Sequence, residues 1–289
     1  MTFSIAGFDP ANGDLGVAVA SRFPCVGAVV PAAKAGVGAV ATQAWANAAF
    51  GPDGIDAMSA GRSAEAASEG LLAADEGRDD RQLGIVDARG GVATFTGSRC
   101  MDWAGGIAGE TCAIQGNILV GPEVVHAMAA AFDDTGGDLC DRLLAALLAG
   151  DEVGGDRRGR QSAAMVVVRE GGGYEGRTDR YIDLRVDDHP EAPGELARLF
   201  GVWDDVMLVR NDPLVAVTPE LVMELQRRLA ALARLDGAAL TGSMDHATRA
   251  ALEAWAGEVN LEGRLRDDDQ LSANLLRELR DITPDVHAP

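Results

Sequence analysis

The order of strand-like and helix-like segments is the feature that most constrains the fold of this chain. Two segments with β-type alternation, 2–8 and 14–20, flank an Asn12-Gly13 pair, which is a strong turn signal between strands. Phe3 and Ile5 fall on one face of the first strand, and small residues fall on the other. Strands joined by so short a turn pair antiparallel. The chain therefore begins with a β-hairpin whose first residue after Met1 is Thr2.

Further hairpins and pairs of helices follow in alternation. We expect strands at 25–31, 36–43, 81–97 (a hairpin turning at 89–91), 111–119, 162–168 and 180–186, and helices at 51–60, 63–74, 122–132, 138–150 and 191–200. Hairpins require antiparallel sheets, and helix pairs inserted between them cover sheet faces. The pattern predicts an α+β fold, a four-layer αββα sandwich.

The composition changes after Arg210, which indicates a second domain. We expect a sandwich domain over 1–208, a linker over 209–218 that contains Pro213, and a small all-α domain over 219–289 that begins at Pro219. Thr218 and Asp245 are positioned to cap its first two helices. A third helix is expected near 271–281.

Charge and cysteine usage limit the partners and the compartment. A net charge of −20 argues against nucleic acid and anionic membrane surfaces, which need a basic footprint. Four cysteines without a CxxC pair favour a reduced, cytoplasmic chain. Asp9 and Asp14 occupy positions where a signal peptide would be apolar. A homo-oligomer is compatible with such a sandwich, but no interface can be identified.

Thr2 is the first candidate for chemistry. If Met1 is removed, the free α-amine has a pKa near ~7.7–8 and can take the proton of the Thr2 hydroxyl, which then acts as a nucleophile. A strand beginning at Thr2 would hold it rigidly. The alternative is a hydroxyl that only satisfies local backbone groups.

Polar residues interrupt two otherwise apolar strands. Thr42 and Gln43 end one, and Gln115 and Asn117 flank Gly116 in the other. Buried amides need hydrogen-bond partners, so backbone capping in a turn is one reading. Contact with a substrate amide or an oxyanion is the other.

The segment GGDRRGRQS at 154–162 is the best candidate for an anion pocket. Asp156, Arg157, Arg160 and Ser162 lie in a charged loop that leads into a buried strand. Its arginines can bind a carboxylate or phosphate bidentately, or they can pair with Asp187 and Asp188 in a structural network.

His189 follows those two aspartates and is a candidate for substrate binding. It could serve as a base, but a histidine beside two aspartates more often forms an exposed ion pair or caps a turn. Motifs for phosphate loops, EF-hand calcium and HExxH zinc are absent from the sequence. We therefore expect no cofactor and no metal.

Several long motifs resemble known families. MTFSIAGFDPANGDLGVAVASR resembles the opening of N-terminal-nucleophile hydrolases. Together with VGAVVPAAKAGVGAVATQA, RQLGIVDARGGVATFTG, QGN at 115–117, GGDRRGRQSAA and DLRVDDHP, it is similar to the bacterial family labelled domain of unknown function 1028. This resemblance covers roughly residues 2–200. It implies an αββα sandwich with Thr2 as the nucleophile.

Two further site residues follow from that resemblance. Lys34, the only lysine, stands where related hydrolases keep a lysine that lowers the pKa of the nucleophile. A lysine at a hairpin tip is the alternative. Proteasome-type subunits carry an aspartate before the Ser-Arg of the second strand, whereas this chain has Ala20 and then Ser21-Arg22. Ser21 is counted among the candidate substrate-binding residues.

The C-terminal segment ELVMELQRRLAALARLDGAALTGSMDHATRAALEAWA resembles the three-helix peptidoglycan-binding-like domain. Its pattern consists largely of helix packing and capping, so it indicates a fold more than a ligand. The sequence as a whole predicts an amidohydrolase that acts on a small amide or peptide-like substrate carrying an anionic group, with Thr2, Lys34 and Asn117 as catalytic residues. The alternative is a non-catalytic ligand- or glycan-binding protein on the same scaffold.

Overall fold

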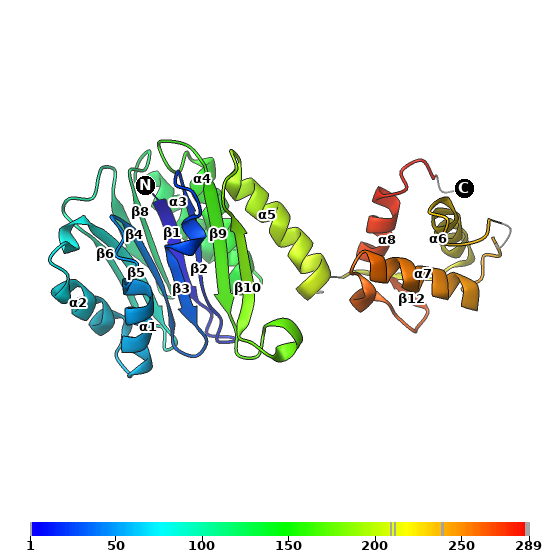
Figure 1. The fold of residues 1–289 in the computed structure, drawn as a ribbon, viewed down its shortest axis with the longest axis horizontal. Coiled ribbons are helices and arrows are strands. Elements are labelled where there is room, and N and C mark those ends of the chain that lie inside the picture. Colours follow the sequence, from blue (N-terminus) through cyan, green and yellow to red (C-terminus); the bar gives the residue numbers. More distant parts are fainter. Residues whose placement is uncertain (1, 209, 211, 238–239, 287–289) are drawn as a thin grey trace. The chain divides into compact units, whose positions relative to one another are not determined.

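The computed structural model describes residues 2–208, 210, 212–237 and 240–286, and the chain divides into two compact units. The first spans Met1–Phe200 and the second Gly201–Pro289. Each unit is treated by itself below (Figure 1).

The first unit contains two antiparallel sheets. A six-stranded sheet has the order β10-β9-β2-β1-β8-β7, and a four-stranded sheet has the order β3-β4-β5-β6. The strands of the larger sheet are β1 (Thr2–Phe8), β2 (Leu15–Ser21), β7 (Gly105–Ala108), β8 (Cys112–Asn117), β9 (Ser162–Val168) and β10 (Arg180–Val186). Those of the smaller sheet are β3 (Pro31–Lys34), β4 (Gly38–Ala44), β5 (Arg81–Asp87) and β6 (Val92–Thr96).

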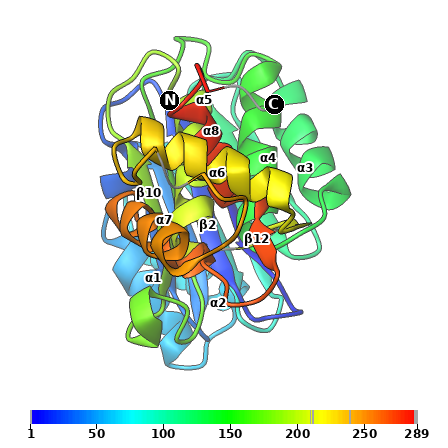
Figure 2. The same cartoon turned by 90° about the vertical axis from the view of Figure 1, so that its right-hand side faces the viewer.

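Helices cover the outer face of each sheet. α1 (Phe50–Ser59) and α2 (Ala64–Ala74) pack on the four-stranded sheet, and α3 (Glu123–Asp134) and α4 (Leu139–Glu152) pack on the six-stranded sheet (Figures 1 and 2). α5 (Ala192–Trp203) follows β10. The predicted four-layer αββα arrangement is confirmed. Apolar clusters lie between the two sheets and between the four-stranded sheet and its helices, and α3 and α4 bury large side chains against the six-stranded sheet.

The alternation of β1 explains how its residues are used. The odd positions face the helices, where a Cβ on Gly7 would lie 3.1 Å from Leu139. The even positions face the other sheet, and Ala6 and Phe8 belong to the apolar cluster between the sheets. Ser4 occupies the same face and is fully buried. The inter-sheet space is therefore apolar at one end of β1 and polar at the end where Thr2 lies.

The apolar run 25–31 is not the strand that its composition predicts. Cys25 has a left-handed φ of 54°, and a 3₁₀ turn (Val26–Ala28) follows it. The Val26 N–H bonds to Ser162 Oγ at 3.1 Å. These contacts bury the run as a turn against β9, so pairing with β4 begins only at Pro31.

Strand β7 is not among the strands that the sequence predicts, and it begins with two glycines. It pairs with β8 from Gly105 to Ala108. A Cβ on Gly106 would lie 2.6 Å from the Ile114 carbonyl oxygen. Glycine, which has weak strand propensity, is required there because the neighbouring backbone comes too close for a side chain.

The second unit is helical and includes a short two-stranded ribbon. Its helices are α6 (Pro219–Ala231), α7 (His246–Glu258) and α8 (Ala273–Asp281), and its strands are β11 (Leu214–Ala216) and β12 (Gln270–Ser272). The predicted caps are present, since Thr218 accepts from Leu221 N–H and Asp245 from Thr248 N–H. The ribbon was not predicted, and β11 falls within the expected linker 209–218.

A buried ion cluster joins α6 to α8. Glu224 Oε1 accepts from Arg228 Nε and from Arg280 Nε, both at 2.8 Å. Arg228 Nη1 also donates to the Thr283 carbonyl oxygen at 2.8 Å. The hydrogen bonds from Arg280 and Arg228 outweigh the effect of burial and lower the pKa of Glu224 to about 2.

The close approach of α4 to the six-stranded sheet generates a first prediction. At Gly16 in β2, a Cβ would lie 2.7 Å from the Val166 carbonyl oxygen and 2.9 Å from Leu143. We expect Gly16→Ala to lower the free energy of unfolding of the full chain by about 1–3 kcal/mol through overpacking, measured by urea denaturation. Gly194→Ala in α5, where nothing lies within 4 Å, is the control. Equal stability of the two variants would contradict the packing analysis.

The Glu224 cluster generates a second prediction. Because the pKa of Glu224 in the folded chain lies below the ordinary glutamate value of 4.5, its stabilisation is present above about pH 4.5 and is lost as the pH falls toward 2. We expect Glu224→Gln to lower the unfolding free energy by about 1–3 kcal/mol at pH 7. The difference from wild type should shrink progressively between pH 4.5 and pH 2 in urea titrations. The exposed Glu253→Gln is the control, and a difference that is independent of pH would refute the assignment.

Candidate functional site

A pocket of about 460 Å³ opens at the polar end of the inter-sheet space. Its polar floor includes Thr2, Gln43 and Asn117. Several of its walls are apolar, and two arginines and an aspartate lie at its edge. The remaining lining residues are Phe23, Val26, Val29, Val30, Ala44, Trp45, Ala46, Asp80, Arg99, Cys100, Met101, Ile118 and Arg158.

Thr2 is held rigidly at this floor. It pairs with Asn117 of β8, and its side chain faces the same way as that of its partner because opposite residues of an antiparallel pair share a face. Thr2 Oγ1 lies 3.0 Å from Ser21 Oγ of β2. Thr2 is only 6% exposed, so it lines the pocket as part of a buried, hydrogen-bonded strand.

A network of side-chain amides supports the floor from below. Gln43 Nε2 donates to the Thr2 carbonyl oxygen at 3.1 Å and to Gln82 Oε1 at 2.8 Å. Asn117 Nδ2 donates to the same Gln82 oxygen at 2.9 Å. Ser4 Oγ donates to Gln43 Oε1 and accepts from Gln115 Nε2, both at 2.7 Å. Because these groups come from both sheets, the network locks the sheets together beneath Thr2.

Two residues on the pocket wall have an unusual backbone conformation. Ala44 and Ile118 have φ values of 70° and 52°, in the left-handed region that is costly for a residue with a Cβ and most costly for a β-branched one. Each follows directly on a residue of the polar floor, Gln43 or Asn117. Strained positions of this kind cluster at functional sites.

The charged groups at the edge of the pocket form ion pairs. Arg99 binds Asp80 through both carboxylate oxygens, at 2.9 and 2.6 Å, and this hydrogen bonding lowers the pKa of Asp80. Arg158 Nη2 lies 3.2 Å from the buried Asp156 carboxylate. Burial raises the pKa of the Cys100 thiol, which disfavours a reactive thiolate at this wall.

Comparison with known proteins identifies the family of this chain. Residues 2–196 match the family of unknown function DUF1028. The chain belongs to the DUF1028 family. A solved DUF1028 structure, protein SPO2555 from Silicibacter pomeroyi, is similar to this chain, with 33% sequence identity and a TM-score of 0.65. The matched region covers 70% of this chain and 86% of the SPO2555 chain. Curated proteins give no match. Residues 208–279 match a family described as "Putative peptidoglycan binding domain".

Lys34 of this DUF1028 chain lies away from the pocket. It pairs with Gly38 at the turn of the β3–β4 hairpin, whereas Gln43 and Ala44 line the pocket at the opposite end of β4. Its Nζ lies 3.2 Å from Ser59 Oγ. The structure thus places Lys34 at a hairpin tip, the alternative that the sequence left open.

The arginine-rich loop is held mainly by internal ion pairs. Arg160 binds Asp151 and Glu191, each at 2.7 Å, in place of the expected Asp187 and Asp188. Asp156 accepts from the Arg22 N–H at 2.8 Å and thereby fixes the loop against the end of β2. Arg157 is exposed next to it.

The remaining sequence candidates have supporting positions. Ser162 is buried and donates to the Phe23 carbonyl oxygen. Thr42 is buried and donates to the Asn47 carbonyl oxygen at 3.2 Å. His189 is exposed, and its Nδ1 accepts from the Glu191 N–H at 3.1 Å, as in a turn cap. Gln115 lies beneath the floor in the amide network. Of the sequence candidates, Thr2, Gln43 and Asn117 line the pocket, whereas a separate hollow of about 330 Å³ is lined by Ser21, Asp156, Arg160 and Ser162.

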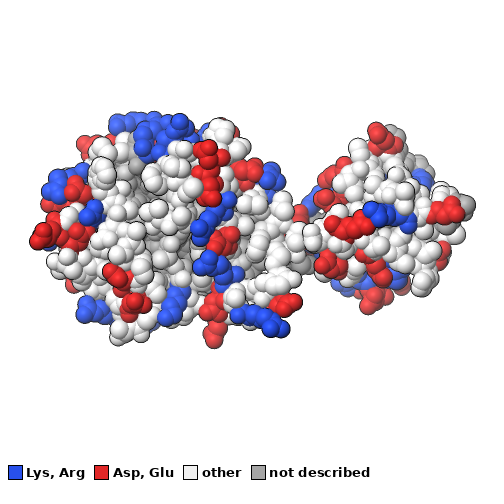
Figure 3. All heavy atoms as spheres, in the orientation of Figure 1, with Lys and Arg blue, Asp and Glu red and all other residues white. Residues whose placement is uncertain are grey.

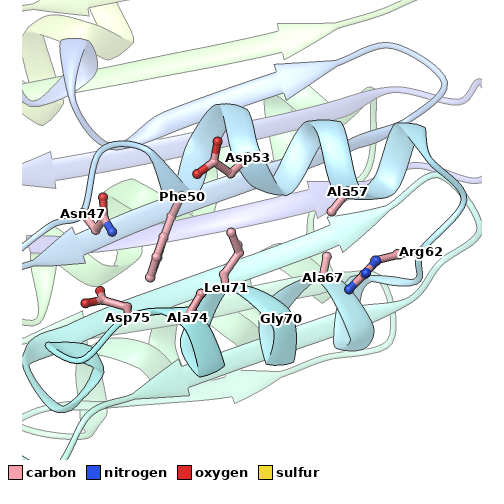
Figure 4. A pocket seen from close by; sticks show the side chains of 10 residues that line it. All are labelled: Asn47, Phe50, Asp53, Ala57, Arg62, Ala67, Gly70, Leu71, Ala74 and Asp75. Atoms are coloured by element: carbon pink, nitrogen blue, oxygen red, sulfur yellow. The ribbon is translucent and has the colours of Figure 1, made fainter.

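A second hollow of about 340 Å³ lies between α1 and α2 (Figure 4). Its floor is apolar, with Phe50 and Leu71 between the helices, and Arg62 and Asp75 lie toward its two ends. Asp75 is bound to Arg81 at 2.7 Å. This hollow contains none of the polar residues that the sequence singled out.

Two kinds of feature are not found in the described part of the chain. No group of three or more His, Cys, Asp or Glu side chains there is arranged to hold a metal ion. Nor does any described helix have the length and apolar character needed to cross a bilayer.

Several residues of the site had no usable signal in the sequence. Gln82 is the centre of the amide network, and its only trace is a polar position near the start of an apolar strand. Phe23, Trp45 and Met101 lie in loops, whose side-chain directions depend on contacts distant in sequence. The sequence shows Arg158 only as one of three arginines in the segment 157–160, with nothing to distinguish it from the other two.

The central position of Gln82 generates a third prediction. Replacing it with leucine removes the acceptor of Asn117 Nδ2, one of the acceptors of Gln43 Nε2 and the side-chain donor to the Gly116 carbonyl oxygen. We expect Gln82→Leu to lower the unfolding free energy by about 2–5 kcal/mol, because buried polar groups lose their partners. Gln161→Leu, whose amide binds the exposed Asp188, should stay within about 0.5 kcal/mol. A neutral Gln82→Leu in urea titrations would show that the network carries little stability.

Proposed function

We propose that the DUF1028 unit is an amidohydrolase of the N-terminal-nucleophile type, with Thr2 as its nucleophile after removal of Met1. The observation that carries the proposal is the position of the Thr2 hydroxyl. It lies on a central strand, at the floor of a pocket, 3.0 Å from the Ser21 hydroxyl. A nucleophile on a rigid element keeps the geometry that attack requires.

The reaction follows from the groups at this floor. The free α-amine of Thr2 accepts the hydroxyl proton while Oγ1 attacks the amide carbonyl carbon. The C–N bond then breaks, and the leaving amine takes that proton. The resulting ester on Thr2 is hydrolysed by water, which restores the hydroxyl and releases a carboxylic acid. Ser21 Oγ lies 3.0 Å from Thr2 Oγ1, so it can hydrogen-bond the hydroxyl that gives up this proton.

Asn117 is the candidate for stabilising the oxyanion. It lines the pocket opposite Thr2, and its amide carries two N–H donors, of which Gln82 takes one. The Gln82 bond fixes the orientation of the amide before the charge develops, as electrostatic stabilisation requires. Arg158 at the edge of the pocket is the group we assign to an anionic part of the substrate.

The proposal gives a fourth prediction, on Thr2 itself. Intact mass should show loss of Met1, and a β-lactone electrophile should add to the Thr2 residue in peptide maps. Against an amide library, Thr2→Ala should lose activity by at least about 10³-fold, and Thr2→Ser should retain part of it. The rate should rise with pH through about 7.7–8.0 as the amine loses its proton.

Thr178→Ala, in the exposed β9–β10 connection, is the control and should behave as wild type. Retention of Met1, or an adduct elsewhere, would overturn the assignment of the nucleophile. A cytoplasmic site of action belongs to the proposal, since the four cysteines of the sequence include no CxxC pair and thiols stay reduced in that compartment.

One observation favours the alternative of a non-catalytic ligand- or glycan-binding protein. With Lys34 at the hairpin tip, the cations among the described lining residues are Arg99 and Arg158, both paired with carboxylates. The second unit, which matches a peptidoglycan-binding family, would then recognise a glycan. Ligand binding that is unchanged in Thr2→Ala, with no turnover by wild type, would favour this alternative.

A further inference from the structure

Three large apolar side chains surround the pocket while remaining exposed. Phe23 is 49% exposed, Trp45 71% and Met101 58%, and all three line the pocket above Thr2. We call them the apolar collar. They come from three separate connections, after β2, β4 and β6. Exposed apolar side chains that gather at one hollow mark a binding site, whereas scattered ones need no explanation.

The backbone of each collar residue is fixed to the framework. The Phe23 carbonyl oxygen accepts from Ser162 Oγ, and the Met101 carbonyl oxygen accepts from the Ile118 N–H at 2.9 Å. The Trp45 N–H donates to the Asp80 carbonyl oxygen at 3.2 Å. The collar is therefore preorganised, so a ligand that it binds avoids much of the entropic cost of ordering loops.

Positive charge lies beside the collar. Arg158 lines the pocket, and the exposed Arg22 and Arg157 belong to the same group of loops. The space-filling view shows the densest gathering of basic side chains at the end of the sandwich where β1 begins (Figure 3). In a chain with a net charge of −20, this local excess favours a small anionic ligand over a basic one.

We propose that the substrate is an N-acyl amino acid, with an apolar acyl chain in the collar and its carboxylate at Arg158. This inference rests on the proposed function, because it describes the substrate of the same pocket. Collar, Arg158 and Thr2 all line one cavity of about 460 Å³, so one small molecule with an apolar end, a carboxylate and an amide between them can contact all three. Cleavage of its C–N bond by water gives a free carboxylic acid and an amino acid.

Binding to the full-length Thr2→Ala protein tests the proposal separately from catalysis. Calorimetric titration with N-acylglycines from acetyl to octanoyl should show affinity rising about three- to fourfold per CH₂ until the collar is filled. Trp45→Ala and Met101→Ala in that background should flatten this dependence. Tyr174→Ala, which removes an equally exposed side chain (70%) outside the pocket, should leave it intact.

A second pair of ligands tests the charge. Arg158→Gln should weaken binding of N-octanoylglycine by about tenfold or more and leave binding of its neutral amide, N-octanoylglycinamide, unchanged. Affinity independent of chain length, a chain-length dependence unaffected by the collar substitutions, or equal loss for both ligands would each overturn the proposal. If the acylglycines bind as expected and wild type does not hydrolyse them, the assignment of the ligand-binding pocket is supported and the proposed amidohydrolase activity is wrong.

Discussion

The amide network between the two sheets is the interaction on which the rest of this molecule depends. In most sandwiches the space between sheets is filled by apolar side chains, and here that holds for the end of β1 at Ala6 and Phe8. At the other end, amide and hydroxyl groups from both sheets replace them. Amides satisfy one another only in a narrow range of distances and angles. The network therefore fixes the separation of the sheets, and with it the position of Thr2, more strictly than apolar packing does.

The same network explains why the backbone is strained around the pocket. Gln43 and Asn117 must keep their side chains on the inter-sheet face, yet the chain has to leave the sandwich immediately after each of them. It does so through positive φ angles at Ala44 and Ile118. The loops that follow carry Trp45 away from β4 and bring the Ile118 N–H onto the Met101 carbonyl oxygen. Because β4 and β8 both end beside the pocket, their last residues supply its polar floor, and the loop after β4 and the contact of Ile118 with Met101 place side chains of the apolar collar.

Periodicity in the sequence was enough to predict the layers, because the alternation of β1 and the helix pairs report burial directly. It failed where partners distant in sequence decide the local structure. The run 25–31 has the composition of a strand but is folded as a turn by Ser162. β7 exists because glycines permit close contact with β8, a use that composition does not distinguish from a turn. Thr2, Gln43 and Asn117 could be found as polar breaks at strand ends, whereas Gln82 and the collar required the packing of the sheets.

The arginines of the 154–162 loop show why charge counting alone could not decide between the two uses of this segment. The sequence left open whether its guanidinium groups bind an anion or pair with carboxylates of the chain. Arg160 is bound to Asp151 and Glu191, and Arg158 shares the buried carboxylate of Asp156. A guanidinium already paired with a carboxylate attracts a second anion weakly, but the pairing fixes the plane in which its N–H donors lie. The charged edge of the pocket is therefore suited to orient a carboxylate, and apolar contact with the collar has to supply most of the affinity.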